Sequence, residues 1–214
     1  MAIVQRFQLI TEADARMLEL GSTIVLVAGG HITPLAKDTL SARRVSVISE
    51  GTADDASSLA PRAEIRTVAV AGDHTSLPLK HAIVAHLRRC GLAAHDLGTA
   101  TSDPVDYPDT AASAALAVAR GEADAAIAID GAGIGSAIAA NKIPGVRAAM
   151  CVNETLARYA RQHNGANVLT LGSTLVTTEQ ALAIVDVFVA TPMREARYIR
   201  RLGKIRELET RPRA

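Results

Sequence analysis

The chain has 214 residues, of which 49% are hydrophobic but 2% aromatic, and its formal net charge is +1. This length suits one ordinary domain with a small addition, and the composition requires a core of Ala, Val, Ile and Leu. A near-neutral charge and so few aromatic rings argue against nucleic-acid binding, which uses basic surfaces and base stacking. No apolar run reaches the length of a membrane span and no signal-peptide pattern opens the chain, so we expect a cytoplasmic protein.

Residues 1–50 have a pattern of their own, and we interpret them as an accessory segment. The predicted elements are a helix at 11–20 that opens with a capping box, a strand at 22–28 with a Gly29–Gly30 turn, a helix from Thr33–Pro34, and a strand at 45–48. This is too little material to bury much core alone. Residues 51–65 lack periodicity and are predicted to be a linker.

From residue 66 onward, strands and helices alternate regularly. The predicted strands are 67–71, 94–97, 125–129, 146–151 and 167–171. The predicted helices are 77–90, an Ala-rich one that ends at Gly121, one after Gly135, then 154–163, 178–189 and a basic helix at 194–209. Because parallel neighbours require crossover helices, we predict an α/β domain at 66–214 with a doubly wound, five-stranded parallel sheet, Rossmann-like.

The last of these helices is amphipathic. Its apolar residues, which we expect to pack inward, are Tyr198, Ile199, Leu202, Ile205 and Leu208.

The two cysteines and a pair of histidines indicate neither a disulfide nor a metal site. Cys90 and Cys151 fall on a predicted helix and a predicted strand, and we expect both to be reduced, buried thiols. His81 and His86 lie five residues apart on one predicted helix and therefore point toward different faces. That spacing is poor for a shared metal, so we expect both histidines to be exposed.

The ends of two predicted strands should form a site. With strand order 2-1-3-4-5, the first and third strands are neighbours, and a crevice opens at their carboxyl ends where doubly wound sheets bind ligands. Asp73–His74 follow the first strand and Asp130–Gly131 follow the third. We therefore expect these residues to meet.

The run from Asp130 to Lys142, D-G-A-G-I-G-S-A-I-A-A-N-K, is the strongest motif. Gly131, Gly133 and Gly135 let backbone amides approach a ligand at a helix N-terminus, where the partial positive charge favours phosphate or an oxyanion. Ile138 is expected on the inner face of the helix. Alone, such a loop is equally compatible with a packing role, and its spacing and position do not fit a dinucleotide fingerprint.

Five segments together resemble the type B ribose-5-phosphate isomerases and the related galactose-6-phosphate isomerase subunits. They are V-A-V-A-G-D-H, D-Y-P-D, the Asp130 motif with its continuation I-P-G-V-R-A, R-Q-H-N-G-A-N-V-L-T-L-G, and the arginines of the last helix. The resemblance spans residues 67 to about 208. It implies an aldose–ketose isomerase that interconverts ribose 5-phosphate and ribulose 5-phosphate without metal or cofactor. It also implies a homodimer or tetramer whose sites are completed across the subunit interface.

The resemblance also assigns roles to matching residues. Asp130 would be the base that moves the proton, and the amides of residues 131–136, Ser136 included, would hold the enediolate oxygens. The other implied roles are sugar and phosphate contacts from Asp73 and His74, ring opening by His163 beside Asn164, a pocket wall from Tyr107, and phosphate binding by Arg197 and Arg201. The chemistry needs these residue types, since a weakly acidic C–H requires a base, developing charge requires donors, and arginine forks suit phosphate.

Four positions depart from the family pattern. The family usually has Cys at Asp130, or a Glu base at Ser136, with Thr or Ser at Ala132 and often Arg at Thr174. We expect burial to raise the basicity of Asp130. The departures leave two alternatives open: an isomerase of another tetrose, pentose or hexose phosphate, and a non-catalytic sugar-phosphate-binding or microcompartment protein.

The N-terminal segment resembles a different group. I-T-E-A-D-A-R through H-I-T-P-L-A-K-D-T-L-S-A-R-R-V-S-V is similar to segments on enzymes of bacterial microcompartments, such as those for ethanolamine and propanediol. The similarity implies contacts with a shell or cargo through residues 1–50 and a location inside such a compartment.

Overall fold

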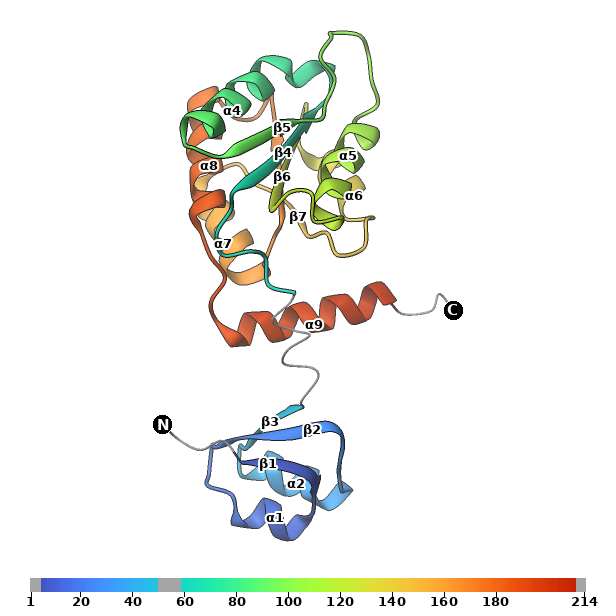
Figure 1. Ribbon diagram of the computed structural model, residues 1–214, viewed down its shortest axis with the longest axis vertical. Coiled ribbons are helices and arrows are strands. Elements are labelled where there is room, and N and C mark those ends of the chain that lie inside the picture. The colour runs from blue at the N-terminus through green and yellow to red at the C-terminus, as the bar shows by residue number, and fades with distance from the viewer. Residues whose placement is uncertain (1–4, 50–58, 211–214) are drawn as a thin grey trace. The chain divides into compact units, whose positions relative to one another are not determined.

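The computed structural model describes residues 5–49 and 59–210 (Figure 1). The chain divides between Ser58 and Leu59 into two compact units. The predicted linker at 51–65 lies partly outside the described residues. Its last residues belong to the second unit, which begins at Leu59 and not at residue 66 as predicted, and Pro61 and Ile65 are buried there.

The first unit is a three-stranded parallel sheet in the order β1-β2-β3 with two helices. Its elements are β1 (Arg6–Ile10), α1 (Glu12–Met17), β2 (Thr23–Ile32), α2 (Pro34–Ala42) and β3 (Ser46–Ser49). The capping box of Thr11 with Asp14 is confirmed, as is the Thr33 cap before Pro34. The predicted Gly29–Gly30 turn is wrong. β2 continues through it, and the pairing with β1 changes register between Phe7 and Leu9, so the glycines lie in an irregular part of one strand.

This unit has its own small core, contrary to our expectation. The two helices contact each other beside the sheet (Figure 1). The buried apolar side chains are Ile10, Ala15, Leu18, Ile24, Leu26, Ala36, Leu40 and Val45. Strand β1, which the sequence pattern did not reveal, supplies the missing part of that core through Ile10.

The second unit is the predicted doubly wound sheet. Its strands are β4 (Thr67–Gly72), β5 (Ala93–Asp96), β6 (Ala125–Asp130), β7 (Ala148–Met150) and β8 (Val168–Gly172), all paired in parallel. Its helices are η1 (His74–Ser76), α4 (Leu77–Arg89), α5 (Tyr107–Ala119), α6 (Ile134–Ala140), α7 (Glu154–Asn164), α8 (Thr178–Ala190) and α9 (Ala196–Thr210). The fold class is therefore confirmed.

The strand order differs from the prediction. The sheet runs β5-β4-β6-β8-β7, so the last strand lies between the third and fourth and gives the order 2-1-3-5-4. Burial explains this choice. β8 is buried along its whole length, as a central strand must be, whereas the three residues of β7 are half-buried and suit an edge.

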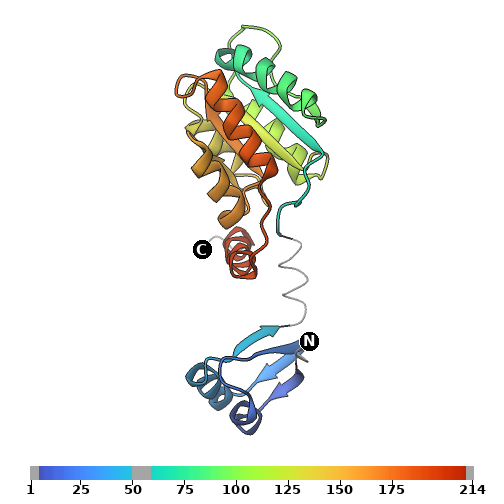
Figure 2. The same cartoon turned by 90° about the vertical axis from the view of Figure 1, so that its left-hand side faces the viewer.

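Helices cover both faces of the sheet (Figures 1 and 2). Helices α5 and α6 lie on one face, where the core consists mostly of alanines and helix and sheet approach closely. Helices α4, α7 and α8 lie on the other face, where the core contains larger side chains such as Phe188 of α8. The crowded alanine face explains why the prediction for Ile138 is wrong: the small Ser136 and Ala140 face inward, and Ile138 is 59% exposed.

Helix α9 lies at the edge of the sheet where the strands begin, and it contacts α7 (Figure 1). Tyr198 and Leu202 pack with Met193 as expected. Ile205 and Leu208 do not, since they are 40% and 65% exposed. Among the described residues, no helix is long and apolar enough to cross a membrane.

Candidate active site

The two predicted strand-end motifs are neighbours. Strand β4 pairs with β6, with Gly72 opposite Ile129, and the Asp73 amide donates to the Ile129 carbonyl at 3.1 Å. Asp73–His74 and Asp130–Gly131 therefore leave adjacent strands at the same edge of the sheet, as the prediction required.

The Asp130 carboxylate is folded into the loop that follows it. Oδ1 accepts hydrogen bonds from the amides of Ala132, at 2.7 Å, and Gly133, and Oδ2 accepts one from the Ser136 amide at 2.8 Å. The residue is 5% exposed. Three of the amides that we expected to face an enediolate are thus directed at Asp130.

These contacts set the charge state of Asp130. Burial by itself raises the pKa of the carboxyl, but Ser136 and the amides of Gly133 and Ala132 outweigh burial and hold the pKa below its usual value. The expectation of raised basicity is therefore wrong. The Ser136 side chain also lowers the pKa of Asp130. Its hydroxyl is buried, and no described residue lies at hydrogen-bond geometry from it.

Strand β8 and the two residues that follow it hold the same loop from its other side. The Thr174 hydroxyl and amide both donate to the Gly131 carbonyl, at 2.6 and 3.0 Å, and the Ser173 amide donates to the Asp130 carbonyl at 2.8 Å. Further in, the Thr170 hydroxyl donates to the Gly133 carbonyl at 2.8 Å. Sequence reasoning missed this role because it placed β8 away from β6.

Close contacts determine the course of the loop. Gly133 has a φ of +75°, and a Cβ there would lie 2.8 Å from the Leu171 carbonyl carbon. A Cβ at Gly135 would lie 2.5 Å from the ring of Tyr107, which covers the start of α6. Tyr107 itself is 43% exposed, so it lies at the mouth of the site.

The first strand end presents an acid and a histidine. Asp73 Oδ1 accepts from the amide of Thr75 at 3.0 Å and from its hydroxyl at 2.7 Å. His74 Nδ1 accepts from the Val105 amide at 3.2 Å. This hydrogen bond assigns the proton of the neutral ring to Nε2, which is then a donor.

Lys80 holds the loop between β5 and α5. Its side chain is fully buried, and Nζ donates to Asp96 at 2.7 Å and to the Thr99 carbonyl at 2.6 Å. That loop also carries Val105 and leads into Tyr107. Lys80 is thus a positioning residue that we did not predict. The one indication in the sequence is that Lys80 stands next to the apolar face of its helix.

The remaining predicted residues form a second cluster. The His163 ring lies between Tyr159 and Tyr198, with ring centres 4.6 and 4.5 Å away. The guanidinium groups of Arg197 and Arg201 both lie over Tyr198, at 4.7 and 5.5 Å. We name His163, Tyr159, Tyr198, Arg197 and Arg201 the arginine cluster.

Other contacts support this cluster. Arg197 also donates to the Tyr198 hydroxyl at 3.0 Å and pairs with Glu195 at 2.6 Å. The exposed Asn164 lies beside it and donates to the Tyr159 carbonyl at 3.2 Å.

One chain does not bring the two groups together. Asp130 pairs with Gly172 at the end of β8, whereas α7 with His163 ends just before β8 begins. The five residues of β8 span roughly 13 Å, so Asp130 and His163 lie at least about that far apart along the strand direction. The strand-end residues and the arginine cluster therefore lie at opposite edges of the sheet.

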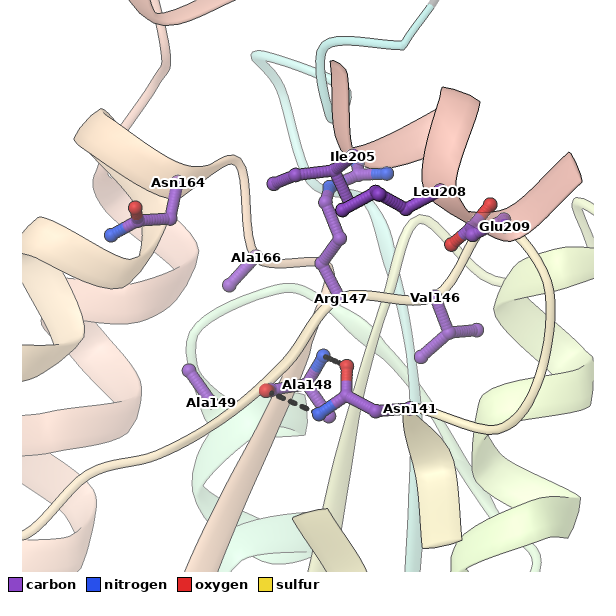
Figure 3. Close-up of a pocket in the computed structure, with 10 residues that line it drawn as sticks. All are labelled: Asn141, Val146, Arg147, Ala148, Ala149, Asn164, Ala166, Ile205, Leu208 and Glu209. Carbon is purple, nitrogen blue, oxygen red and sulfur yellow. Dashed lines mark hydrogen bonds between the residues drawn. The ribbon is translucent and has the colours of Figure 1, made fainter. Parts of the chain in front are cut away.

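An open pocket of about 390 Å³ lies near the arginine cluster, between the start of β7 and α9 (Figure 3). Its lining residues are Asn141, Val146, Arg147, Ala148, Ala149, Asn164, Ala166, Ile205, Leu208 and Glu209. Burial lowers the pKa of Arg147, although nearby Glu209 opposes this effect. The guanidinium of Arg147 donates to the carbonyls of Gly165 and Leu59, at 2.7 and 2.9 Å. Of the predicted site residues, Asn164 lines this pocket, whereas Asp130 and His163 do not.

The second unit is similar to known proteins. The family model described as Ribose/Galactose Isomerase matches residues 68–205. The chain belongs to this family. The N-terminal unit lies outside the match.

Individual relatives of the family agree. Ribose-5-phosphate isomerase B of Escherichia coli (strain K12) is 43% identical over 147 residues, which cover 69% of this chain and 99% of that protein. The structure of Clostridium thermocellum ribose-5-phosphate isomerase B has a TM-score of 0.66 at 43% identity, over 67% of this chain and 97% of that one. That of the Mycoplasma genitalium enzyme with bound ribulose-5-phosphate has a TM-score of 0.65 at 40% identity, over 68% and 97%. The resemblance of residues 67 to about 208 to these isomerases is confirmed.

Proposed function

We propose that this chain interconverts ribose 5-phosphate and ribulose 5-phosphate through an enediolate, with Asp130 as the base. The observation that carries the proposal is a buried carboxylate at a strand end, next to Asp73 and His74 on the neighbouring strand. Relatives named ribose-5-phosphate isomerase B, one of them with bound ribulose-5-phosphate, support the choice of substrate.

The two oxygens of Asp130 are not equivalent. Oδ1 accepts two amide hydrogen bonds and Oδ2 accepts one, so Oδ2 keeps a lone pair for a proton. Its lowered pKa keeps the carboxylate ionised at neutral pH. In the proposed reaction, Oδ2 takes the proton from C2 of the aldose and returns it to C1. In the same proposal, Nε2–H of His74 stabilises charge on the substrate oxygens, since Nδ1 is occupied by the Val105 amide.

A second copy of the chain completes the site. Proton transfer takes place at the carboxyl ends of the strands, and phosphate binding needs the arginines at the opposite edge. A twofold dimer places the arginine cluster of each chain against the strand ends of the other and yields two complete sites. Ile205 and Leu208 on α9 are exposed apolar side chains beside that cluster and suit a protein contact.

Two substitutions at residue 130 test the base. Asp130→Asn lowers kcat by about 10²–10⁴-fold, the usual contribution of a general base. Asp130→Cys, which installs the usual family residue, retains turnover and moves the acid limb of the pH profile upward toward the thiol pKa near 8.5. Circular dichroism shows whether both variants are folded. A folded Asp130→Asn enzyme with normal kcat would remove Asp130 from the mechanism.

Subunit mixing tests the shared site. Asp130→Asn and His163→Ala are each inactive as homodimers. When the two are unfolded together and refolded, half of the dimers carry one intact site, so about a quarter of the wild-type activity returns. If no activity returns although mixed dimers form, the site belongs to one chain.

The arrangement around Asp130 favours one second candidate, an isomerase of another sugar phosphate. The carboxylate accepts hydrogen bonds from three loop amides, and Thr174 donates to the Gly131 carbonyl. The surroundings of the proposed base therefore differ from those of a cysteine base. A panel of tetrose, pentose and hexose phosphates compared by kcat/KM decides between the two. Binding without turnover across the panel would indicate a non-catalytic protein.

The N-terminal unit serves location and not catalysis. Its support is a core of its own and its similarity to segments of microcompartment enzymes. Deletion of residues 1–58 leaves kcat and KM unchanged but abolishes co-purification with compartment shells. If the shortened protein still enters shells, this unit does not direct it there.

A further inference from the structure

Three side chains with metal-binding atoms meet on the α4–α8 face, away from the candidate active site. His86 lies in the last turn of α4, Cys90 caps the C-terminus of that helix four residues later, and Asp186 lies on α8. His86 Nε2 is 2.6 Å from Asp186 Oδ1 and 3.7 Å from Cys90 Sγ. One ligand atom from each of the three residues lies within 4.8 Å of the others, the one such group among the described residues.

This arrangement corrects two expectations. Cys90 is exposed and not buried, unlike Cys151, whose pKa burial raises to about 11. His86 points toward α8, where it contacts Asp186, and its side chain is 16% exposed and not solvent-facing as predicted. His81 faces solvent, as predicted. The sequence did not reveal the cluster because its third member, Asp186, is 100 residues away from His86.

We propose that His86, Cys90 and Asp186 bind one zinc ion. A nitrogen, a thiolate and a carboxylate are the donor types that Zn²⁺ takes, and a water would complete a tetrahedron. With the usual bond lengths, tetrahedral ligand atoms lie about 3.3 Å apart for N and O and about 3.6 Å apart for N and S. The observed N to S separation already fits. To admit the ion, the Asp186 carboxylate has to move roughly 0.7 Å away from His86 Nε2 and toward Cys90 Sγ, which lies within 4.8 Å of it.

Zinc binding moves one proton and releases another. In the ion-free state, Arg89 lies 3.4 Å from His86 Nδ1, so the ring proton lies on Nε2 and faces Asp186. On binding, the imidazole proton passes to Nδ1, Nε2 and the Cys90 thiolate bind the ion, and the thiol proton is released to solvent. Arg89 is exposed and makes a long contact, so it turns away. Arg89 therefore opposes the ion, and its removal strengthens binding.

The site connects the end of α4 to α8 and does not take part in the reaction. Helix α4 begins after the strand end that carries Asp73 and His74, and it runs back so that Cys90 lies at the opposite edge of the sheet. Zinc at this place acts as a structural link on the rim of the second unit. The isomerase reaction proceeds with or without it.

Cobalt and zinc titrations of the full chain test the site. Co²⁺ added to wild type gives a thiolate-to-cobalt absorption band at one ion per chain, and zinc displaces it. His86→Gln, Cys90→Ser and Asp186→Asn each weaken Zn²⁺ binding by more than the ~10–100-fold typical of losing an outer partner. His81→Gln, on the same helix but exposed, binds as wild type does, and Arg89→Gln binds more tightly. Absence of the band in wild type, or equal affinity in all variants, overturns the proposal.

Alkylation of Cys90 gives an independent measurement. Iodoacetamide modifies this exposed thiol at a rate that mass spectrometry follows residue by residue. Zinc slows the reaction in wild type and in His81→Gln but not in His86→Gln. An equal rate with and without zinc in wild type would show that the thiol does not hold the ion.

Discussion

Substituting Gly133 by alanine tests whether the backbone of β8 fixes the Asp130 loop. Gly133 has a φ of +75°, and the added Cβ would lie 2.8 Å from the Leu171 carbonyl carbon and 2.9 Å from the Gly172 nitrogen. Gly145 is a matched control, because its φ is +80° and a Cβ there has no neighbour within 4 Å. The two variants share the conformational penalty and differ in the contact.

The expected magnitudes follow from these distances. A left-handed alanine costs roughly 1–2 kcal/mol at either position. At Gly133 the contact is with backbone, so β8 and the loop must separate by a few tenths of an ångström, which costs a further 1–3 kcal/mol, roughly. Gly133→Ala should therefore lower the free energy of unfolding by about 2–5 kcal/mol and Gly145→Ala by about 1–2 kcal/mol.

Tyrosine fluorescence in urea measures this difference in the right part of the chain. The protein has no Trp, and its three Tyr residues, Tyr107, Tyr159 and Tyr198, all lie in the second unit. The signal thus reports the unfolding of that unit alone. Gly133→Ala should also lower kcat, because the Gly133 amide donates to Asp130. Equal destabilisation by the two variants would refute the close approach of β8.

Three further predictions use the same assay. Lys80→Met removes the ammonium group that donates to Asp96 and to the Thr99 carbonyl. Because Asp96 is 32% exposed, we expect the free energy of unfolding to fall by about 2–3 kcal/mol. The exposed Lys142→Met should change stability little, and a similar loss there would contradict this reasoning. Arg161→Met leaves the carbonyls of Thr191, Ala166 and Arg62 without their buried donor, and should cost about 3 kcal/mol or more, against near zero for the exposed Arg158→Met. The pKa of Asp130 is lowered in the folded state, so its carboxylate stabilises the fold above the unfolded pKa, and this contribution disappears as pH falls through the folded value. The stability deficit of Asp130→Asn should therefore be full at pH 7 and shrink below about pH 4; a constant deficit from pH 7 to 3 would argue against the lowered pKa.

Local sequence patterns predicted most elements of the second unit and the meeting of the two strand ends in the candidate active site. Apolar runs and caps predicted the strands and helices of the second unit, and the adjacency of the first and third strands brought Asp73 near Asp130, as the structure confirms. The resemblance grouped Arg197 and Arg201 as phosphate binders, and the structure brings both over the Tyr198 ring. These predictions succeed because each depends on a few consecutive residues or on a general rule of sheet topology.

Other features depend on contacts between distant segments. Nothing in the sequence of β8 says that it pairs with β6, so the Thr174 clamp on Gly131 was not foreseen. The inward face of α6 was assigned to the large Ile138, yet the alanine face of the sheet admits smaller residues there. The pKa of Asp130 was misjudged because burial was considered without the amides that its own loop supplies.

The sequence by itself determined the alternation of strands and helices, the position of Asp130 at the end of a buried strand, and membership in the isomerase family through five separated motifs. Tertiary structure alone decided the strand order, the lowered pKa of Asp130, the separation of Asp130 from the arginine cluster, and the meeting of His86, Cys90 and Asp186. The physical reason is range. Periodicity and capping act within a few residues, whereas charge state and side-chain clusters depend on which distant backbone packs alongside.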